Sequence, residues 1–423
     1  MSKLDETDVK SVQTERIGDF KSCVNLVLTA VGVGVLALPK AIAQSGWTIG
    51  CVLLLLTWGL SQSMMHLLWR CTETAKQRYG HKIDSYGSIG EAALGKPGRY
   101  VVSFATYTGL SAICTIILIL LGGGLKNLTE SMSDGFWRRI AALCILPLSW
   151  LPTLKEVGVL SGVGVVAVCV VVVVVVAASI GLTGDERGDI SALPPTSGGL
   201  AMSFIEFMNS YTVAPVIPTI IVGMKDGSHY PRVAAYGFSI ITLVFAVIGF
   251  AGYAGWGDAL LSPEGGNITD FIANSSSRVY SVTCQVAIIV VSLSHFLVMF
   301  NPVALLSDML IGNIPGVTTN TSNKFLRIGL RMAGRSAIVG LMLLVALYVP
   351  SFGTIVDLVG STVVIPLQVL FPIAFFLVIC REDIKNMSGI KRAGLYGLFA
   401  LTVCLSLVAM VYGLYNVFTN WKL

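Results

Sequence analysis

Apolar residues along the chain fall into long runs, separated by short breaks rich in charged residues, glycine and proline. A transmembrane helix needs about 20 mostly apolar residues, and runs of this length recur from Cys23 almost to the C-terminus. The pattern therefore predicts an all-α polytopic membrane protein with eleven spans, at residues 21–44, 47–69, 100–121, 137–151, 157–180, 200–224, 233–256, 279–300, 333–349, 352–380 and 393–417.

The fifth run contains consecutive valines from Val170 to Val176. A β-branched run of this kind is typical of a buried strand in a soluble protein. An isolated strand in lipid leaves its backbone groups without hydrogen-bond partners, whereas a helix satisfies them internally. The run is also too long for a strand, so we predict a helix here.

Composition agrees with a membrane protein. Only 12% of the residues are charged and 54% are hydrophobic, whereas soluble domains have about 25% charged residues. Residues 1–20 are polar and carry both signs of charge, which predicts a short cytosolic tail before a single transmembrane domain at 21–423. The net charge of +5 is small and the basic residues are scattered, so nucleic acid is not an expected partner.

The nine cysteines lie in or beside apolar runs, and no CxxC pair or histidine cluster is present. We therefore expect no disulfide framework, no metal site and no cofactor. No nucleophile, base and orienting group stand together in the sequence, so an enzyme is not expected. No ATP-binding motif is present either, which disfavours a primary pump.

The distribution of positive charge predicts the orientation. With the N-terminus inside, about three quarters of the 28 Lys and Arg residues fall in inner segments. The C-terminus is then extracellular or lumenal. With this orientation the sequons at Asn127, Asn267 and Asn274 fall in outer loops, which supports the orientation weakly. We expect the protein in a eukaryotic plasma membrane or in a vacuolar or lysosomal membrane.

The first span carries Gly32, Gly34 and Pro39 near its middle. Glycine costs about 1 kcal/mol and proline about 3 kcal/mol in a helix interior, so this span should unwind around Val31 to Val35. Unwound backbone at membrane depth is tolerated where it lines a cavity, and a polar ligand can then bind its free amides and carbonyls. Close helix packing through small residues is the alternative reading.

The sixth span has polar residues at 209–212 followed by Pro215 and Pro218. Proline favours the first turn of a helix and disfavours helical geometry in the residue before it. This span should therefore break around Asn209 to Ala214. Two broken spans that run in opposite directions, five helices apart, predict a five-plus-five inverted repeat with substrate at the midplane, and a peripheral eleventh helix.

The stretch "NLVLTAVGVGVLALPKAIAQSGW" at 25–47 resembles the first-helix signature of the amino acid/auxin permease family, which has the LeuT-type fold of the APC superfamily. The segments "SYTVAPVIPTI" and "VPSFGTIVDLVGSTVVIPLQVLFP" are similar to that family as well. Many members have Gly-His in the sixth helix, where this chain has Val213-Ala214. The resemblance implies an amino acid transporter that binds substrate at both breaks.

An amino acid offers a carboxylate and an ammonium group. The amides of Gly32, Val33, Gly34 and Val35 lie at the positive end of a helix dipole and suit the carboxylate. Carbonyls near Ala30 and Val31, and at Phe207 to Ser210, suit the ammonium group. Further candidates for lining the pocket are Tyr107, Asn209, Ser210, Tyr211 and Thr212; the tyrosines can instead be packing residues.

Ionisable side chains inside spans are costly and often functional. Glu206 and His295 are the candidates for ion or proton coupling, and Asp357 lies near the outer end of the tenth span. His295 titrates near neutral pH, although it can also be a neutral structural residue. Glu206 can relay protons, neutralise a cationic substrate or cap a helix near the interface.

These features predict a secondary active amino acid transporter that works by alternating access. A proton gradient is preferred over sodium because of Glu206 and His295. The alternative is a membrane amino acid sensor that signals through a partner, although the short N-terminal tail offers little effector surface. A simple channel is disfavoured by the paired breaks.

Overall fold

The computed structural model describes residues 17–80, 83–129, 132–150, 154–182, 187–196, 198–262, 267–275, 277–312, 324–349 and 352–420. Almost all of these residues are helical, and the β-bridge found within them pairs Ile17 with Met224. Most of the expected cytosolic tail lies outside the described residues.

Nine described helical stretches are long and apolar enough to cross a membrane. They contain α4 (Trp47–Tyr79), α5 (Tyr86–Thr129), α7 (Leu154–Gly181), α8 (Gly199–Ser210) with α9 (Ile217–Gly223), α10 (Tyr230–Trp256), α12 (Arg278–Gly312), α13 (Lys324–Tyr348), α14 (Phe352–Val359) with α15 (Phe371–Ile379), and α17 (Gly389–Asn420). A bent pair, α2 (Asp19–Ala30) with the 3₁₀ turn η1 (Val33–Ala37) and α3 (Leu38–Ser45), makes a tenth.

The predicted count of eleven spans is not confirmed. The segment expected to span at 137–151 corresponds to α6 (Asp134–Ser149), which has 16 residues and is shorter than a span requires. Within α6, Arg138 is buried and its guanidinium donates to the carbonyl of Val349 at 2.9 Å. The valine run is helical, in α7, because lipid leaves its backbone no other partner.

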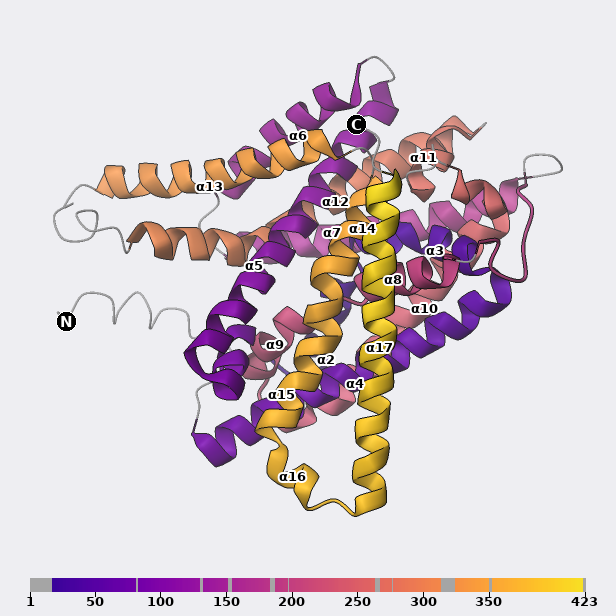
Figure 1. Ribbon diagram of the computed structural model, residues 1–423. Helices are drawn as coiled ribbons and strands as arrows, with labels where there is room; N and C mark the ends of the chain where they lie inside the picture. The colour runs from indigo at the N-terminus through magenta and orange to yellow at the C-terminus, as the bar shows by residue number, and fades with distance from the viewer. Residues whose placement is uncertain are drawn as a thin grey trace.

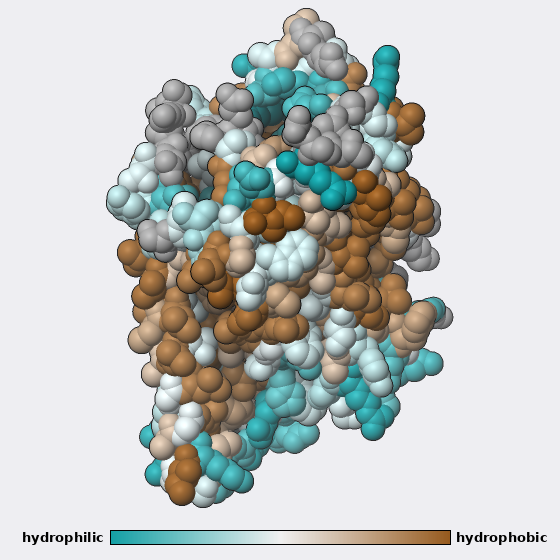
Figure 2. All heavy atoms as spheres, turned by 90° about the vertical axis from the view of Figure 1, so that its right-hand side faces the viewer, coloured by the Kyte–Doolittle hydropathy of each residue, from teal (hydrophilic) through white to brown (hydrophobic). Residues whose placement is uncertain are grey.

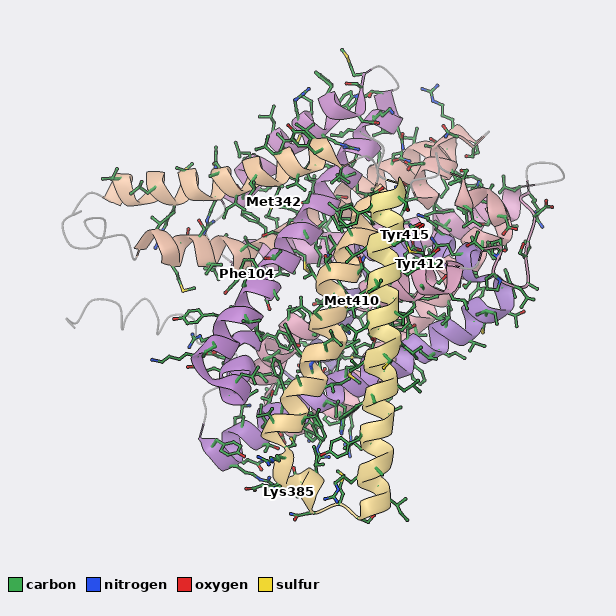
Figure 3. The ribbon with its side chains drawn as sticks, viewed as in Figure 1. Phe104, Met342, Lys385, Met410, Tyr412 and Tyr415 are labelled. Carbon is green, nitrogen blue, oxygen red and sulfur yellow. The ribbon has the colours of Figure 1, made fainter. Side chains whose placement is uncertain are left out.

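The surface has the zonation of a membrane protein. Figure 2 shows a broad hydrophobic band across one face, with hydrophilic residues gathered above and below it. Phe104 on α5, labelled in Figure 3, has 74% of its surface exposed. A broad apolar band of this kind, on helices long enough to cross a bilayer, is typical of an integral membrane protein.

In the bundle, α12 packs on α5 and α7, whereas α10 packs on α7 and on α2, α3 and α4. Figure 1 shows α17 along one side of the bundle, beside α14 and α15. Only 17% of the most apolar part of α17 is buried, the lowest share among the described spans. α17 packs on α8. Tyr412 of α17, labelled in Figure 3, has its hydroxyl where a side chain on Gly198, just before α8, would lie.

One polar end of the molecule is held by ion pairs. Arg78 at the end of α4 contacts Glu382 at 3.3 Å and also pairs with Asp383, both on α16 (Arg381–Lys385). Figure 3 shows Lys385 at this end, far along α15 and α17 from Tyr412. The pairs fix the turn between α15 and α17.

Two sequence interpretations change at the opposite end. The sequon residue Asn267 is only 6% exposed, and its side chain accepts from the amide of Thr269 at 2.8 Å, so it caps α11 (Ile268–Ala273) instead of standing free. The Asn127 side chain donates to Asp270 at 3.0 Å. These contacts remove the weak support for orientation that the two sequons offered.

Candidate functional site

The first interruption lies between α2 and η1. Regular helix ends at Ala30, and the amide of Val31 still donates to Val27 at 2.8 Å. Gly32 then takes φ −129° and ψ −144°, which turns the chain away from helix. At this break the span bends by 48° between the helix before it and the helix after it. The bend follows from the weak helix propensity of glycine at this position.

The interruption leaves two backbone donors without acceptors. The Gly32 amide donates to Ala30 and the Val35 amide to Gly32. Among the described residues, no acceptor is found for the amides of Val33 and Gly34, which open the second half of the span. Free amides at the start of a helix are an anion-binding arrangement.

The second interruption lies between α8 and α9. Residues 211–213 are not helical, and the chain resumes with a 3₁₀ turn, η3 (Ala214–Val216), before α9. Gln368, in a π-helical turn (Pro366–Leu370), donates to the carbonyl of Tyr211 at 2.9 Å and accepts from the amide of Ala214 at 3.1 Å. This side chain satisfies backbone groups that would otherwise be stranded in the membrane interior.

Gln368 was missed in the sequence because an isolated glutamine gives no signal of its contacts. It is fully buried.

The carbonyls at Phe207 to Ser210, expected to bind the ammonium group, are partly used within the protein. The carbonyl of Phe207 accepts from the amide of Tyr211, and that of Asn209 accepts from the amide of Thr212. Each carbonyl keeps a second lone pair that a ligand can use.

The two interruptions touch one another. The hydroxyl of Ser210 donates to the carbonyl of Gly34 at 3.0 Å, and also to Glu206 one turn earlier in α8. A Cβ on Gly34 would lie 3.3 Å from the Cα of Ser210, so glycine permits this approach. The ends of two distant segments thus form one junction.

His295 closes a further side of this junction. It projects from α12, and a Cβ on Gly32 would lie 2.4 Å from Cε1 of its ring. No hydrogen-bond partner for the ring is found in the described part of the chain. The imidazole therefore lies directly against the backbone of the first interruption.

A small cavity of about 20 Å³ lies beside the junction. It is lined by residues from α2, α5, α12 and both sides of the second interruption, among them Thr29, Gly109, Thr212, Met299 and Val363. Such a volume holds about one water molecule. The junction is thus closely packed in this conformation.

Of the other residues proposed to line the pocket, only some lie at the cavity. Thr212 lines the cavity, whereas Tyr107 does not; from α5 the lining residues are Gly109, Leu110 and Ile113. The side chain of Tyr211 is fully buried, hydrogen-bonds to Thr242 at 2.7 Å and packs on the ring of Phe245 in α10. Tyr211 therefore contributes its backbone to the junction and its side chain to the core.

Glu206 is not a surface cap. It is 1% exposed, and its Oε1 lies 3.7 Å from Nζ of Lys40 on α3. Lys40 lies within the second half of the first span. Asp357 on α14 is also buried and interacts with the Lys40 charge.

Comparison with known proteins decides the family. The model of the family described as "Transmembrane amino acid transporter protein" matches residues 15–419. The chain belongs to this family. The relatives include the Arabidopsis thaliana amino acid transporters AVT1E, 26% identical over 97% of this chain and 74% of that protein, and AVT1I, 25% identical over 95% and 96%.

Solved structures agree with the fold. A sodium-coupled sialic acid symporter in a substrate-bound outward-open state has a TM-score of 0.57 at 14% identity and covers 96% of this chain and 90% of its own. Mhp1, a nucleobase-cation-symport-1 family transporter in a closed conformation with bromovinylhydantoin, has a TM-score of 0.55 at 15% identity and covers 96% and 92%. The resemblance to the amino acid/auxin permease family and its LeuT-type fold is confirmed, and membership in a transporter family confirms that the chain is not an enzyme.

Proposed function

We propose that the chain is a secondary active amino acid transporter that works by alternating access. The observation that carries the proposal is the contact between Ser210 and Gly34, which brings two interrupted helices together beside two free amides. The names of the relatives, all amino acid transporters, support the substrate class.

In this proposal the substrate carboxylate binds the amides of Val33 and Gly34, at the positive end of the helix that follows. The ammonium group binds the carbonyls of Ala30 and Val31 and those at the end of α8. Both groups of the amino acid then meet backbone atoms, whereas side chains such as Thr212 contact its variable part. The segments from α2 to α15, with the short α6 counted as one of ten membrane segments, form the inverted repeat and α17 lies outside it.

We propose proton coupling, with the N-terminus cytosolic. Two ionisable side chains, Glu206 and His295, lie within spans and adjoin the junction. An ionisable group is retained inside a membrane at a considerable cost in free energy, which favours a functional role.

Uptake into proteoliposomes tests the function. Purified protein is reconstituted, and the accumulation of radiolabelled amino acids is measured with an inward proton gradient, an inward sodium gradient, or neither. We expect accumulation with the proton gradient and its loss when a protonophore is added. Exchange that needs no gradient, or a requirement for sodium, would contradict proton coupling; no transport of any kind would contradict the function.

A further inference from the structure

Three charged side chains meet inside the bundle where α3, α8 and α14 pack together. Lys40 contributes an ammonium group, and Glu206 and Asp357 contribute carboxyl groups. The two carboxyl side chains are 1% and 5% exposed, whereas Lys40 is 20% exposed and is the member of the cluster nearest to solvent. This cluster of Lys40, Glu206 and Asp357 is called the α3–α8–α14 cluster below.

The charges of the cluster do not balance. One ammonium group faces two carboxyl groups, so the fully ionised cluster carries a net charge of −1 among apolar helices. Oε2 of Glu206 and Oδ1 of Asp357 are buried, and neither finds a hydrogen-bond donor within the described residues. A buried carboxylate that lacks both a counter-charge and a donor is strongly disfavoured.

No neighbour supplies the missing positive charge among the residues that the structure describes. Gln44 on α3 faces Glu206 and is uncharged. On the α4 side, Ser61 contacts Met208; Ser361, in the π-helical turn after α14, binds the backbone of Asp357. From α17, Tyr412 packs at the start of α8. Lys40 is the cation that acts on both carboxyl groups.

We propose that the α3–α8–α14 cluster binds one exchangeable proton, on Glu206 or Asp357, and that this is the proton whose gradient drives uptake. The inference rests on the proposed function and adds Lys40 and Asp357 to it. A proton from water converts one carboxylate to a neutral carboxylic acid, and the cluster then has no net charge. A sodium ion fits less well, because the ammonium group of Lys40 already occupies one carboxylate and repels a second cation.

The cluster is linked directly to the substrate junction. The carbonyl of Glu206 accepts from Ser210, and the same hydroxyl binds Gly34 in the first interruption. The hydroxyl of Ser203, one turn before Glu206, donates to the carbonyl of Ala41, next to Lys40, at 2.6 Å. A change of charge at Glu206 therefore acts on α8, the helix whose Ser210 contacts the first interruption.

Proteoliposomes test the coupling role. Wild-type protein, E206Q and D357N are compared for exchange of internal against external radiolabelled amino acids and for accumulation driven by a pH gradient. We expect both variants to lose gradient-driven accumulation by about tenfold or more while exchange remains measurable and no longer depends on pH. The control is D270N, which changes a partly buried carboxyl group in α11, away from the cluster; it should accumulate amino acids as the wild type does.

Infrared spectroscopy tests the proton itself without transport. We expect the wild type at neutral pH to show the carbonyl band of a protonated carboxyl group, and this band to be absent in E206Q or in D357N but present in D270N. Gradient-driven accumulation at the wild-type level in both cluster variants, or an unchanged carbonyl band in both, would overturn the proposal. Either of these two results can be obtained while the wild type still exchanges amino acids. Failure of the proposed function is different, because the wild type would then show no transport at all. If a cluster variant does not fold, the remaining variant and the band of the wild type decide the matter, since a wild type without the band also overturns the proposal.

Discussion

The side chain of Ser210 donates a hydrogen bond to the backbone carbonyl of Gly34 at 3.0 Å, across 176 positions of sequence. Each residue lies at the end or the start of an interrupted helix. A hydrogen bond between these two positions couples the geometry of one interruption to that of the other, so a shift of α8 is felt at the free amides of the first span.

Removing this bond should affect substrate more than stability. We expect S210A to lose about 1 kcal/mol of stability, the usual contribution of one hydrogen bond, and to bind amino acids less tightly. The matched control is S203A, which removes another hydroxyl-to-carbonyl bond between α8 and α3, to Ala41 at 2.6 Å. Substrate affinity from competition uptake should fall in S210A and not in S203A; equal affinities in the two variants would contradict the role of Ser210.

Gly32 should not tolerate a side chain. A methyl group there would lie 2.4 Å from the His295 ring, so the His295 side chain, the interruption or α12 has to move. We expect G32A to reduce uptake by at least about tenfold, which corresponds to a distortion of about 1.4 kcal/mol. The control is G123A on α5, where nothing lies within 4 Å of the added carbon. Uptake by G32A at the level of G123A would show that the His295 contact is not close in the working protein.

Gln368 should be required for the second interruption. The substitution Q368L keeps the size of the side chain but leaves the carbonyl of Tyr211 and the amides of Val213 and Ala214 without partners. We expect it to lower the free energy of unfolding by at least about 3 kcal/mol, because each of the three stranded groups costs about 1 to 3 kcal/mol. A thermal shift in detergent measures this. Q368E keeps an acceptor, and its buried carboxyl group also keeps a donor once it is protonated, so its melting temperature should fall between those of Q368L and the wild type.

Asp270 should make stability depend on pH. Burial raises the pKa of its carboxyl group, and the hydrogen bond from Asn127 offsets part of this effect. The folded protein therefore holds the proton more tightly than the unfolded chain, and this contribution to stability is present at low pH and lost as pH rises through the folded pKa. As pH rises from about 4, the unperturbed pKa of an aspartate, the melting temperature of D270N should fall less than that of the wild type; identical pH profiles would contradict the assignment.

The spans themselves were largely readable from the sequence, because the length of an apolar run is a direct requirement of the bilayer. The count was harder to predict. The segment that forms α6 is apolar on average, but Arg138 within it binds carbonyls at the end of α13, so the helix is short and partly polar. A proline inside a span does not fix its end either: α12 contains Pro302 and continues to Gly312.

Some features of the candidate site could also be predicted from the sequence, and others could not. Glycine and proline lower helix stability wherever they stand, so weak points at Gly32 and Pro215 were visible, and α2 and α8 end within five residues of them. Side-chain partners were not visible, because contacts such as Gln368 with Ala214 or Lys40 with Glu206 join residues 154 and 166 positions apart. No local pattern encodes such pairs.

A structure with a bound amino acid tests the central claim most directly. We expect density for the substrate at the junction of the two interruptions, with its carboxylate within hydrogen-bond distance of the amides of Val33 and Gly34. A substrate bound elsewhere in the bundle, or a carboxylate held by side chains while these amides stay free, would contradict it.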